Sequence, residues 1–194
     1  MTDRVARRPH GRKARAVYAA DDVHSFTWEP VLDALELRTG DRLLDVGCGG
    51  GVFLRRALET GCTATGIDHS IEMVRLARRT TAGAAQIVHG DAHALPFRDG
   101  EFTALSCIVA FFFLAEPVSA LREFRRVLDF ERGRIAVFTT APELKGTPAA
   151  PYPLATRGHF YEDEELERLP RDAGFTYSRV TRPDTGAQLL VARG

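Results

Sequence analysis

The sequence predicts an α/β fold in which helices cover both faces of a doubly wound, mostly parallel sheet of seven strands. Short apolar or β-branched runs alternate with amphipathic stretches of helical period, which is the pattern of consecutive β–α units. The connections are short, so neighbouring strands should run parallel with a helix crossing between them. The last two runs, 175–181 and 187–192, flank Pro183, Asp184 and Gly186, a composition typical of a hairpin. One antiparallel strand is therefore expected near the edge of the sheet.

The first two β–α units have the clearest boundaries. Residues 43–47 read as a buried strand that ends in glycine, and a helix is expected over 52–59. The next strand covers 63–68. A helix then follows up to Arg79, and Ser70 suits its N-cap because a serine hydroxyl accepts hydrogen bonds from the first free backbone N–H groups.

The remaining elements continue the alternation. Three further strands are expected, each a short apolar or β-branched run, over 85–89, 102–108 and 134–139. Pro117 suits the first turn of a helix up to Leu128, because proline lacks the N–H that has no partner there. A last helix is expected over 162–173 and ends before Gly174.

Length and composition indicate a single globular domain. The chain has 194 residues, of which 44% are apolar and 27% charged, and these values exclude disordered, collagen-like and coiled-coil classes. We expect residues 28–194 to form this domain and residues 1–27 to form a basic N-terminal arm and a lid helix. The stretches 12–20 and 28–37, which precede the first strand, are the candidate lid helices. Three cysteines without CxxC spacing predict neither a disulfide framework nor a metal site.

The formal net charge is zero, but the basic residues are unevenly placed. Residues 1–15 carry six basic side chains against Asp3 alone. Such an arm could contact RNA or acidic lipid, although a solvated terminus is the commoner case. The N-terminus lacks the apolar segment of a signal peptide, and the longest apolar run, 107–115, is about half a membrane span. We therefore expect a cytoplasmic protein without a membrane span.

Glycines follow the first predicted strand directly, in the run Asp45-Val46-Gly47-Cys48-Gly49-Gly50-Gly51. In doubly wound folds, ligands bind beyond the carboxyl ends of such strands. Glycine permits a positive φ and lets a ligand lie on the backbone, and the start of the following helix favours an anionic group. A nicotinamide dinucleotide loop is an alternative, since Asp68 lies about 20 residues further on, but the third glycine of that fingerprint falls at Val52. The dinucleotide interpretation fails at that position.

Three motifs in order resemble those of the class I S-adenosylmethionine-dependent methyltransferases. Residues 43–51 resemble the family's first motif, in which an acid precedes alternating glycines. Residues 66–70 resemble the second-strand acid with its following helix, and residues 89–97 resemble the third-strand acid and the turn after it. The resemblance runs from Trp28 to the C-terminus and points to the small-molecule type. It implies a Rossmann-like domain, methyltransferase activity and S-adenosylmethionine as cofactor.

The resemblance also implies a role for each motif residue. Asp68 would accept hydrogen bonds from both ribose hydroxyls, which a carboxylate with two oxygens suits. Asp91 would accept from the adenine amino group, the N–H of Ala92 would donate to a ring nitrogen, and Asp45 would face the amino end of methionine. Apolar side chains that would enclose the adenine ring are Ile67, Met73 and Leu95. The expected cofactor-binding residues are Tyr18, Asp45, Gly47, Gly49, Gly51, Asp68, His69, Met73, Asp91, Ala92 and Ile108.

The expected acceptor side departs from the family pattern. After the fourth strand the family commonly has a polar or histidine-containing segment, whereas this chain has Ala110-Phe111-Phe112-Phe113-Leu114. This run predicts an apolar or aromatic wall, with two of the three phenylalanines filling the core beneath it. A separate departure, away from the expected cofactor site, is Thr103, which stands where an acid is common in the family. The residues expected to contact the acceptor are Phe112, Phe113 and Tyr161. No catalytic residue is assigned, and the candidate bases are the histidines, with His24 and His159 ahead of His69 and His93.

Methyl transfer to a small, partly apolar metabolite is therefore the expected function, with an oxygen, nitrogen or carbon atom as acceptor. A small molecule is the expected partner, and nucleic acid is not expected. Two alternatives stay open. One is an RNA or protein methyltransferase that uses the basic residues 1–15, and the other is a protein that binds the cofactor without turnover. The sequence leaves the oligomeric state open.

Overall fold

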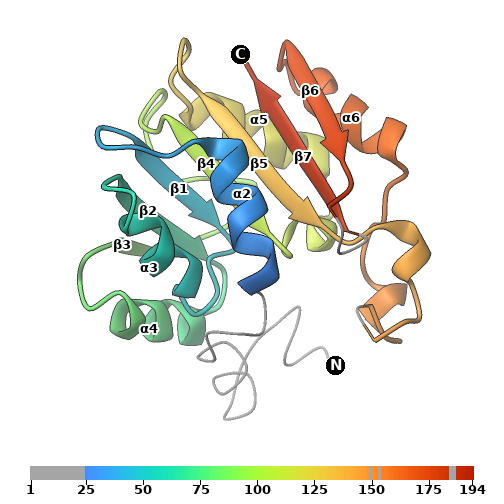
Figure 1. Cartoon of the computed structure of the whole chain (residues 1–194), viewed down its shortest axis with the longest axis horizontal. Helices are drawn as coiled ribbons and strands as arrows, with labels where there is room; N and C mark the ends of the chain where they lie inside the picture. The colour runs from blue at the N-terminus through green and yellow to red at the C-terminus, as the bar shows by residue number, and fades with distance from the viewer. Residues whose placement is uncertain (1–24, 149, 153, 184–186) are drawn as a thin grey trace.

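A seven-stranded sheet is the centre of the computed structural model, which describes residues 25–148, 150–152, 154–183 and 187–194. The strands are β1 (Arg42–Val46), β2 (Thr63–Asp68), β3 (Gln86–His89), β4 (Ala104–Ile108), β5 (Arg134–Thr139), β6 (Tyr177–Thr181) and β7 (Gln188–Arg193). Their order across the sheet is β3-β2-β1-β4-β5-β7-β6 (Figure 1). Among these seven strands, β7 alone is reversed in direction, and it pairs antiparallel with both of its neighbours, β5 and β6. The predicted fold class, including one reversed strand near the edge, is confirmed.

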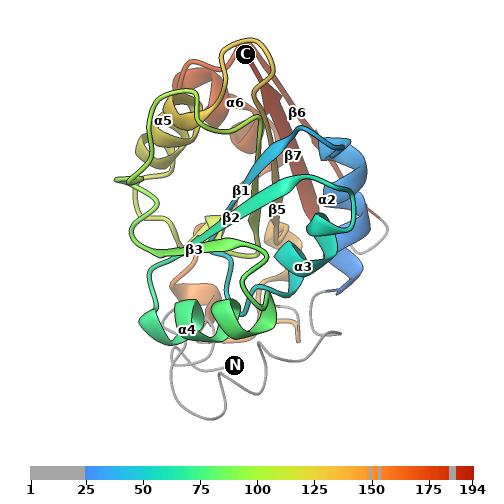
Figure 2. The ribbon, with the colours of Figure 1, turned by 90° about the vertical axis from the view of Figure 1, so that its left-hand side faces the viewer.

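Helices cover both faces of this sheet. The described α-helices are α2 (Trp28–Leu35), α3 (Val52–Leu58), α4 (Ile71–Thr80), α5 (Pro117–Val127) and α6 (Asp163–Asp172). Figure 2 shows α5 and α6 on one side of the sheet and α2 and α3 on the other. Four 3₁₀ helices lie in the connections: η1 (Ser25–Thr27), η2 (Phe111–Phe113), η3 (Pro142–Leu144) and η4 (Leu154–Thr156). No helix within the described ranges is long and apolar enough to cross a membrane.

Local sequence explains where several elements begin. The Ser70 hydroxyl caps α4 by accepting a hydrogen bond from the Met73 backbone N–H at 3.4 Å. Pro117 lies in the first turn of α5, as predicted. Strand β4 begins later than predicted, because Phe102 forms an isolated bridge with Leu128 instead of joining the ladder.

Alternate residues of the strands are buried on opposite faces of the sheet. On β5, Ile135 and Val137 belong to the core cluster that packs with α5 and α6. Their neighbours Ala136 and Phe138 belong to the second cluster, which packs with α2 and α3. Both faces of the sheet are therefore core, which explains why its strands read as nearly continuous apolar runs.

Helix α2 belongs to this core and is not a lid. Val31 and Leu35 on α2 are fully buried, and the helix contacts β4, β5 and β7 as well as α3. The expectation of a lid helix over 28–37 is therefore wrong, since the apolar face of this amphipathic segment covers the sheet. The other candidate, 12–20, lies outside the described residues.

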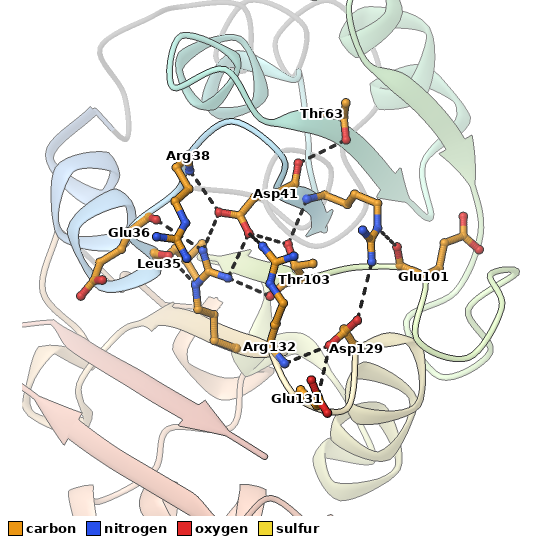
Figure 3. A network of polar contacts seen from close by, with 12 residues as sticks. Leu35, Glu36, Arg38, Asp41, Thr63, Glu101, Thr103, Asp129, Glu131 and Arg132 are labelled. Atoms are coloured by element: carbon orange, nitrogen blue, oxygen red, sulfur yellow. Dashed lines mark hydrogen bonds and ion pairs between the residues drawn. The ribbon is translucent and has the colours of Figure 1, made fainter.

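A buried carboxylate, Asp41, connects three strands at the edge of the sheet where their amino ends lie (Figure 3). Asp41 is only 1% exposed, and its Oδ2 accepts hydrogen bonds from Arg134 Nη2 at 2.9 Å and from the Arg38 backbone N–H at 3.1 Å. Its Oδ1 accepts from the Thr103 hydroxyl at 2.7 Å. Burial would raise the pKa of Asp41, but the hydrogen bonds from Arg134, Thr103 and Arg38 lower it to about 2. The carboxylate beside Thr103 is therefore that of Asp41, which accepts a hydrogen bond from the Thr103 hydroxyl.

Candidate cofactor and acceptor site

The glycine loop folds tightly over the carboxyl end of β1. Gly47, Gly49 and Gly51 have φ angles of 75°, 52° and 79°, which other residues rarely adopt. A Cβ on Gly47 would lie 2.6 Å from the Ala110 Cβ, and a Cβ on Gly51 would lie 2.9 Å from the Ala77 Cα. Side chains at these two positions would collide with their neighbours, so the loop presents bare backbone on which a ligand can lie.

Asp68, the last residue of β2, lies against this loop. It is 6% exposed, and its Oδ2 accepts a hydrogen bond from the Gly49 N–H at 2.9 Å while its Oδ1 accepts one from the Ser70 N–H at 2.8 Å. Burial raises the pKa of the Asp68 carboxyl, and the two N–H groups oppose that shift. Each oxygen has a second lone pair, so the carboxylate retains the capacity to accept from a diol.

Asp45 lies on β1 and is 3% exposed. Its Oδ1 accepts a hydrogen bond from the Ser106 hydroxyl at 2.7 Å, and Ser106 is its neighbour in the parallel register of β4. Burial raises the pKa of Asp45 to about 7; the Ser106 hydroxyl opposes this shift and the charge of Asp68 adds to it. The two carboxyls interact in one buried region, which favours a cationic group beside them. Sequence reasoning missed Ser106, and only the β1–β4 register identifies it.

Asp91, which follows β3, is the most open of the three motif acids. Its side chain is 68% exposed, and its Oδ1 accepts hydrogen bonds from the His93 backbone N–H at 2.9 Å and from His93 Nδ1 at 2.8 Å. These bonds lower the pKa of Asp91, so the carboxylate is ionised. His69 directly follows β2, with its Nδ1 3.6 Å from Asp68 Oδ1 and its carbonyl oxygen 3.0 Å from His89 Nε2 at the end of β3. Ala92 is half-buried.

The apolar residues expected at the cofactor lie in three separate core clusters. Ile67 and Leu95 are buried in the cluster that packs with α5 and α6. Met73 is fully buried but packs with Leu76 in a cluster of its own. Ile108, at the end of β4, is half-buried against the cluster on the other face. The structure therefore places Ile67 and Leu95 in the same core cluster, and Met73 and Ile108 in two others.

Three aromatic rings pack together beyond the end of β4 and are called the aromatic stack below, although the Phe112 and Phe113 rings are tilted by 48°. The ring centroids of Phe112 and Phe113 are 4.3 Å apart, and those of Phe112 and Phe160 are 5.6 Å apart with an interplanar angle of 20°. Lys145 Nζ lies 5.0 Å from the centroid of the Phe160 ring. Phe111 is fully buried and Phe112 is 3% exposed, whereas Phe113 is half-buried. Phe113 is thus the most open of the three consecutive phenylalanines.

Tyr161 and His159 adjoin this stack. Tyr161 is 6% exposed, and its ring centroid lies 6.0 Å from that of Phe111. The exposed His159 ring stacks on Tyr161 at 6.3 Å with an interplanar angle of 18°. The His159 N–H donates to the Phe112 carbonyl at 2.7 Å and so joins residues 140–160 to η2. Two expected site residues lie outside the described part of the chain, namely Tyr18 and His24.

A glycine loop after β1 and an acid after β2, both at the carboxyl edge of a doubly wound sheet, define a Rossmann-like domain that binds a nucleoside-containing cofactor. A family model described as a methyltransferase domain matches residues 44–136. The demethylmenaquinone methyltransferase of Staphylococcus aureus (strain JH9) is 31% identical over 199 residues, which cover 88% of this chain and 82% of that protein.

Two further comparisons extend this result. An uncharacterized 37.1 kDa protein in transposon TN4556 of Streptomyces fradiae is 41% identical over 103 residues, but the match spans only 30% of that protein and 50% of this chain. The crystal structure of an S-adenosylmethionine-dependent methyltransferase from Aquifex aeolicus has the same fold, with a TM-score of 0.75 and 22% identity over 91% of this chain and 96% of that chain.

The chain belongs to the class I S-adenosylmethionine-dependent methyltransferase family. It is a methyltransferase, and S-adenosylmethionine is its cofactor. The residues present fit that molecule: three glycines with positive φ form a loop without side chains at the end of β1, and the buried Asp68 retains lone pairs for a diol.

Proposed function

We propose that this methyltransferase transfers a methyl group to a small, flat and largely apolar metabolite. The observation that carries this proposal is the partly exposed Phe113 ring, which packs on the buried Phe112 ring beyond the end of β4, where Phe112 stacks on Phe160. Such rings favour an apolar ring as their neighbour, whereas a polar macromolecule would gain little from them. A relative named for demethylmenaquinone, 31% identical to this chain, supports the same class of acceptor.

In this proposal the cofactor lies across the carboxyl ends of β1, β2 and β3. Asp68 accepts from the ribose hydroxyls, and Asp45 faces the amino group of methionine. Asp91 accepts from the adenine amino group, and the N–H of Ala92 donates to a ring nitrogen. The glycine loop lets the methionine part approach the backbone, because glycine at positions 47, 49 and 51 permits the positive φ angles that form this turn. Residues that flank the cofactor in this proposal are His69, Met73 and Ile108.

When bound, S-adenosylmethionine supplies a methyl group that is already activated by its sulfonium centre. The task of the chain is then to hold the acceptor atom in line, about 3–3.5 Å from that methyl group, and to keep water out. An oxygen or carbon acceptor also benefits from a base that removes its proton. We propose His159 for this role, because its exposed ring stacks on Tyr161 beside the aromatic stack.

A methylation assay with labelled cofactor tests the acceptor class. The full chain is incubated with three separate pools: a metabolite extract supplemented with a reduced naphthoquinone, total RNA, and soluble protein. We expect label in the solvent-extractable small molecules only. Label confined to RNA or protein would contradict the proposal. Binding of S-adenosylhomocysteine without label in any pool would instead favour a cofactor-binding protein without turnover.

Removal of residues 1–15 provides the matched control for this assay. A small-molecule enzyme keeps its acceptor activity without the basic arm. An enzyme that acts on RNA loses affinity for RNA, and the salt dependence of that affinity becomes shallower because fewer phosphate contacts remain.

A further inference from the structure

Three buried polar atoms near the carboxyl end of β5 have no hydrogen-bond partner among the described residues. They are the Thr139 hydroxyl, the Tyr161 hydroxyl and Oε1 of Gln188. Their residues are 2%, 6% and 0% exposed, respectively, so bulk water does not reach them. Buried polar groups in folded proteins are nearly always paired, so three unpaired atoms in one region point to a missing partner.

The three residues lie together on one side of the sheet. Thr139 and Gln188 are directly opposite each other in the antiparallel β5–β7 register, which puts their side chains on the same face. This is the face of α5 and α6, because Val137 and Leu190, each two residues away along its strand, belong to that cluster. Tyr161 belongs to the same cluster, and its carbonyl accepts a hydrogen bond from Gln188 Nε2 at 2.9 Å.

The chemistry of Gln188 defines which ligand group would fit. Its Nε2 donates to the Tyr161 carbonyl and to Asp163 Oδ1, the latter at 2.6 Å. Both of these neighbours are acceptors, so the nitrogen of the Gln188 amide must face them and not its oxygen. Oε1, which is an acceptor, therefore points away from them. A partner for Oε1 has to donate a proton. The Thr139 and Tyr161 hydroxyls can each donate or accept, so a ligand hydroxyl, which both donates and accepts, has the chemistry to pair with each of the three.

The position of this cluster is where an acceptor would be expected. Thr139 ends β5, which is two strands from β1 and therefore about 10 Å from the glycine loop. The Phe111 ring lies beside Tyr161, and the Phe160 ring stacks on Phe112. Aromatic rings therefore adjoin the three polar side chains.

We propose that Thr139, Tyr161 and Gln188 form the polar end of the acceptor site and bind a hydroxyl group carried on an aromatic ring. This proposal rests on the proposed function and narrows its substrate class to hydroxylated aromatic compounds. Burial raises the pKa of the Tyr161 hydroxyl to about 12, so Tyr161 stays protonated and acts as a hydrogen-bonding group that positions the acceptor.

Thermal unfolding of two conservative variants tests whether the hydroxyls lack partners in the unliganded protein. Tyr161→Phe and Thr139→Val should leave the Tm unchanged or raise it, because each removes an unpaired buried hydroxyl. Thr81→Val is the matched control, since the buried Thr81 hydroxyl donates to the Ala77 carbonyl at 2.9 Å. Its Tm should fall by about 2–4 °C. An equal fall in all three variants would overturn the proposal.

Ligand discrimination tests the site directly, with protein first saturated with S-adenosylhomocysteine. Calorimetry compares 1-naphthol with 1-methylnaphthalene, which has a methyl group in place of the hydroxyl. We expect 1-naphthol to bind at least about tenfold more tightly, and the Thr139→Val/Tyr161→Phe double variant to reduce that ratio below about threefold. Equal affinities, no binding of either probe, or an unchanged ratio in the double variant would overturn the polar subsite. Failure of S-adenosylhomocysteine to bind would instead contradict the proposed function.

Discussion

Asp45 is a residue whose electrostatics depend strongly on the fold around it. The carboxyl is 3% exposed and interacts with the negative charge of Asp68, and its pKa is raised to about 7. An acid with a raised pKa in the folded protein stabilises the fold only while it is protonated. That contribution is present below the unfolded pKa of about 3.9 and is lost as the pH rises through about 7. In the unliganded protein at neutral pH, this site is therefore a source of instability.

The variant Asp45→Asn should remove this pH dependence. Asparagine keeps an oxygen for the Ser106 hydroxyl but never ionises, so we expect the free energy of unfolding to rise by about 1–2 kcal/mol at pH 8 and to change little at pH 4. Urea denaturation at the two pH values measures the difference. If Asp45→Asn is instead less stable than the wild type at pH 8, neighbouring groups stabilise the ionised Asp45 carboxylate and the prediction is wrong.

At the residue scale, the sequence allowed us to predict those features of the site that depend only on residue type and spacing. The positive φ of Gly47, Gly49 and Gly51 follows from such a pattern. Contacts between distant segments were not predictable. Ser106 becomes the partner of Asp45 only through the β1–β4 register, and the burial of Tyr161 depends on packing between η2 and the start of α6.

At the element scale, the glycine loop fixes the distance between α3 and α4. Gly51 is the N-cap of α3, and a Cβ there would lie 2.9 Å from both Cα and Cβ of Ala77 in α4. Gly51→Ala should lower the free energy of unfolding by about 2–4 kcal/mol, because alanine is strained at this left-handed φ and because its Cβ forces the two helices apart. It should also weaken S-adenosylhomocysteine binding. Chemical denaturation and calorimetry measure the two effects.

Gly83→Ala is the control for this prediction. Gly83 has a φ of 84°, close to the 79° of Gly51, but a Cβ there would meet nothing within 4 Å. Gly83→Ala should therefore lower the free energy of unfolding by about 1–2 kcal/mol from backbone strain alone and leave the affinity for S-adenosylhomocysteine unchanged. Equal losses of stability in the two variants would mean that the contact with Ala77 is unimportant.

Element types and order were predictable because alternation of apolar runs and helical stretches determines them locally. The role of helix α2 was not, since an amphipathic pattern shows that one face is buried but not what covers it. Residues 28–37 were one of two candidate lid segments, and the apolar face of α2 packs against the sheet instead. The same limit applies to Phe112, which packs in a stack with Phe160.

At the scale of the whole molecule, the Asp41 network fixes the starts of β1, β4 and β5 relative to one another (Figure 3). The pKa of Asp41 is lowered to about 2, so its stabilising effect is complete above the unfolded pKa of about 4 and is lost as the pH falls through about 2. Asp41→Asn should therefore cost about 2–4 kcal/mol at pH 7 and clearly less at pH 3. Denaturation at both pH values measures this.

The exposed ion pair of Glu59 with Arg56 provides the comparison for Asp41. Glu59 is 60% exposed, and a pair of this kind contributes little because water screens it. Glu59→Gln should change the free energy of unfolding by less than about 0.5 kcal/mol. A similar effect of both substitutions would contradict the claim that the buried network organises the sheet.

The central claim is that the cofactor binds at the carboxyl edge of β1, β2 and β3, with Asp68 at its ribose. Calorimetric titration of S-adenosylhomocysteine into the wild type, Asp68→Asn and Asp172→Asn measures this most directly, since Asp172 lies on α6 and half of its side chain is exposed. We predict binding to the wild type and to Asp172→Asn with equal affinity, and at least about tenfold weaker binding to Asp68→Asn. Absence of binding to the wild type, or undiminished affinity in Asp68→Asn, would contradict the account.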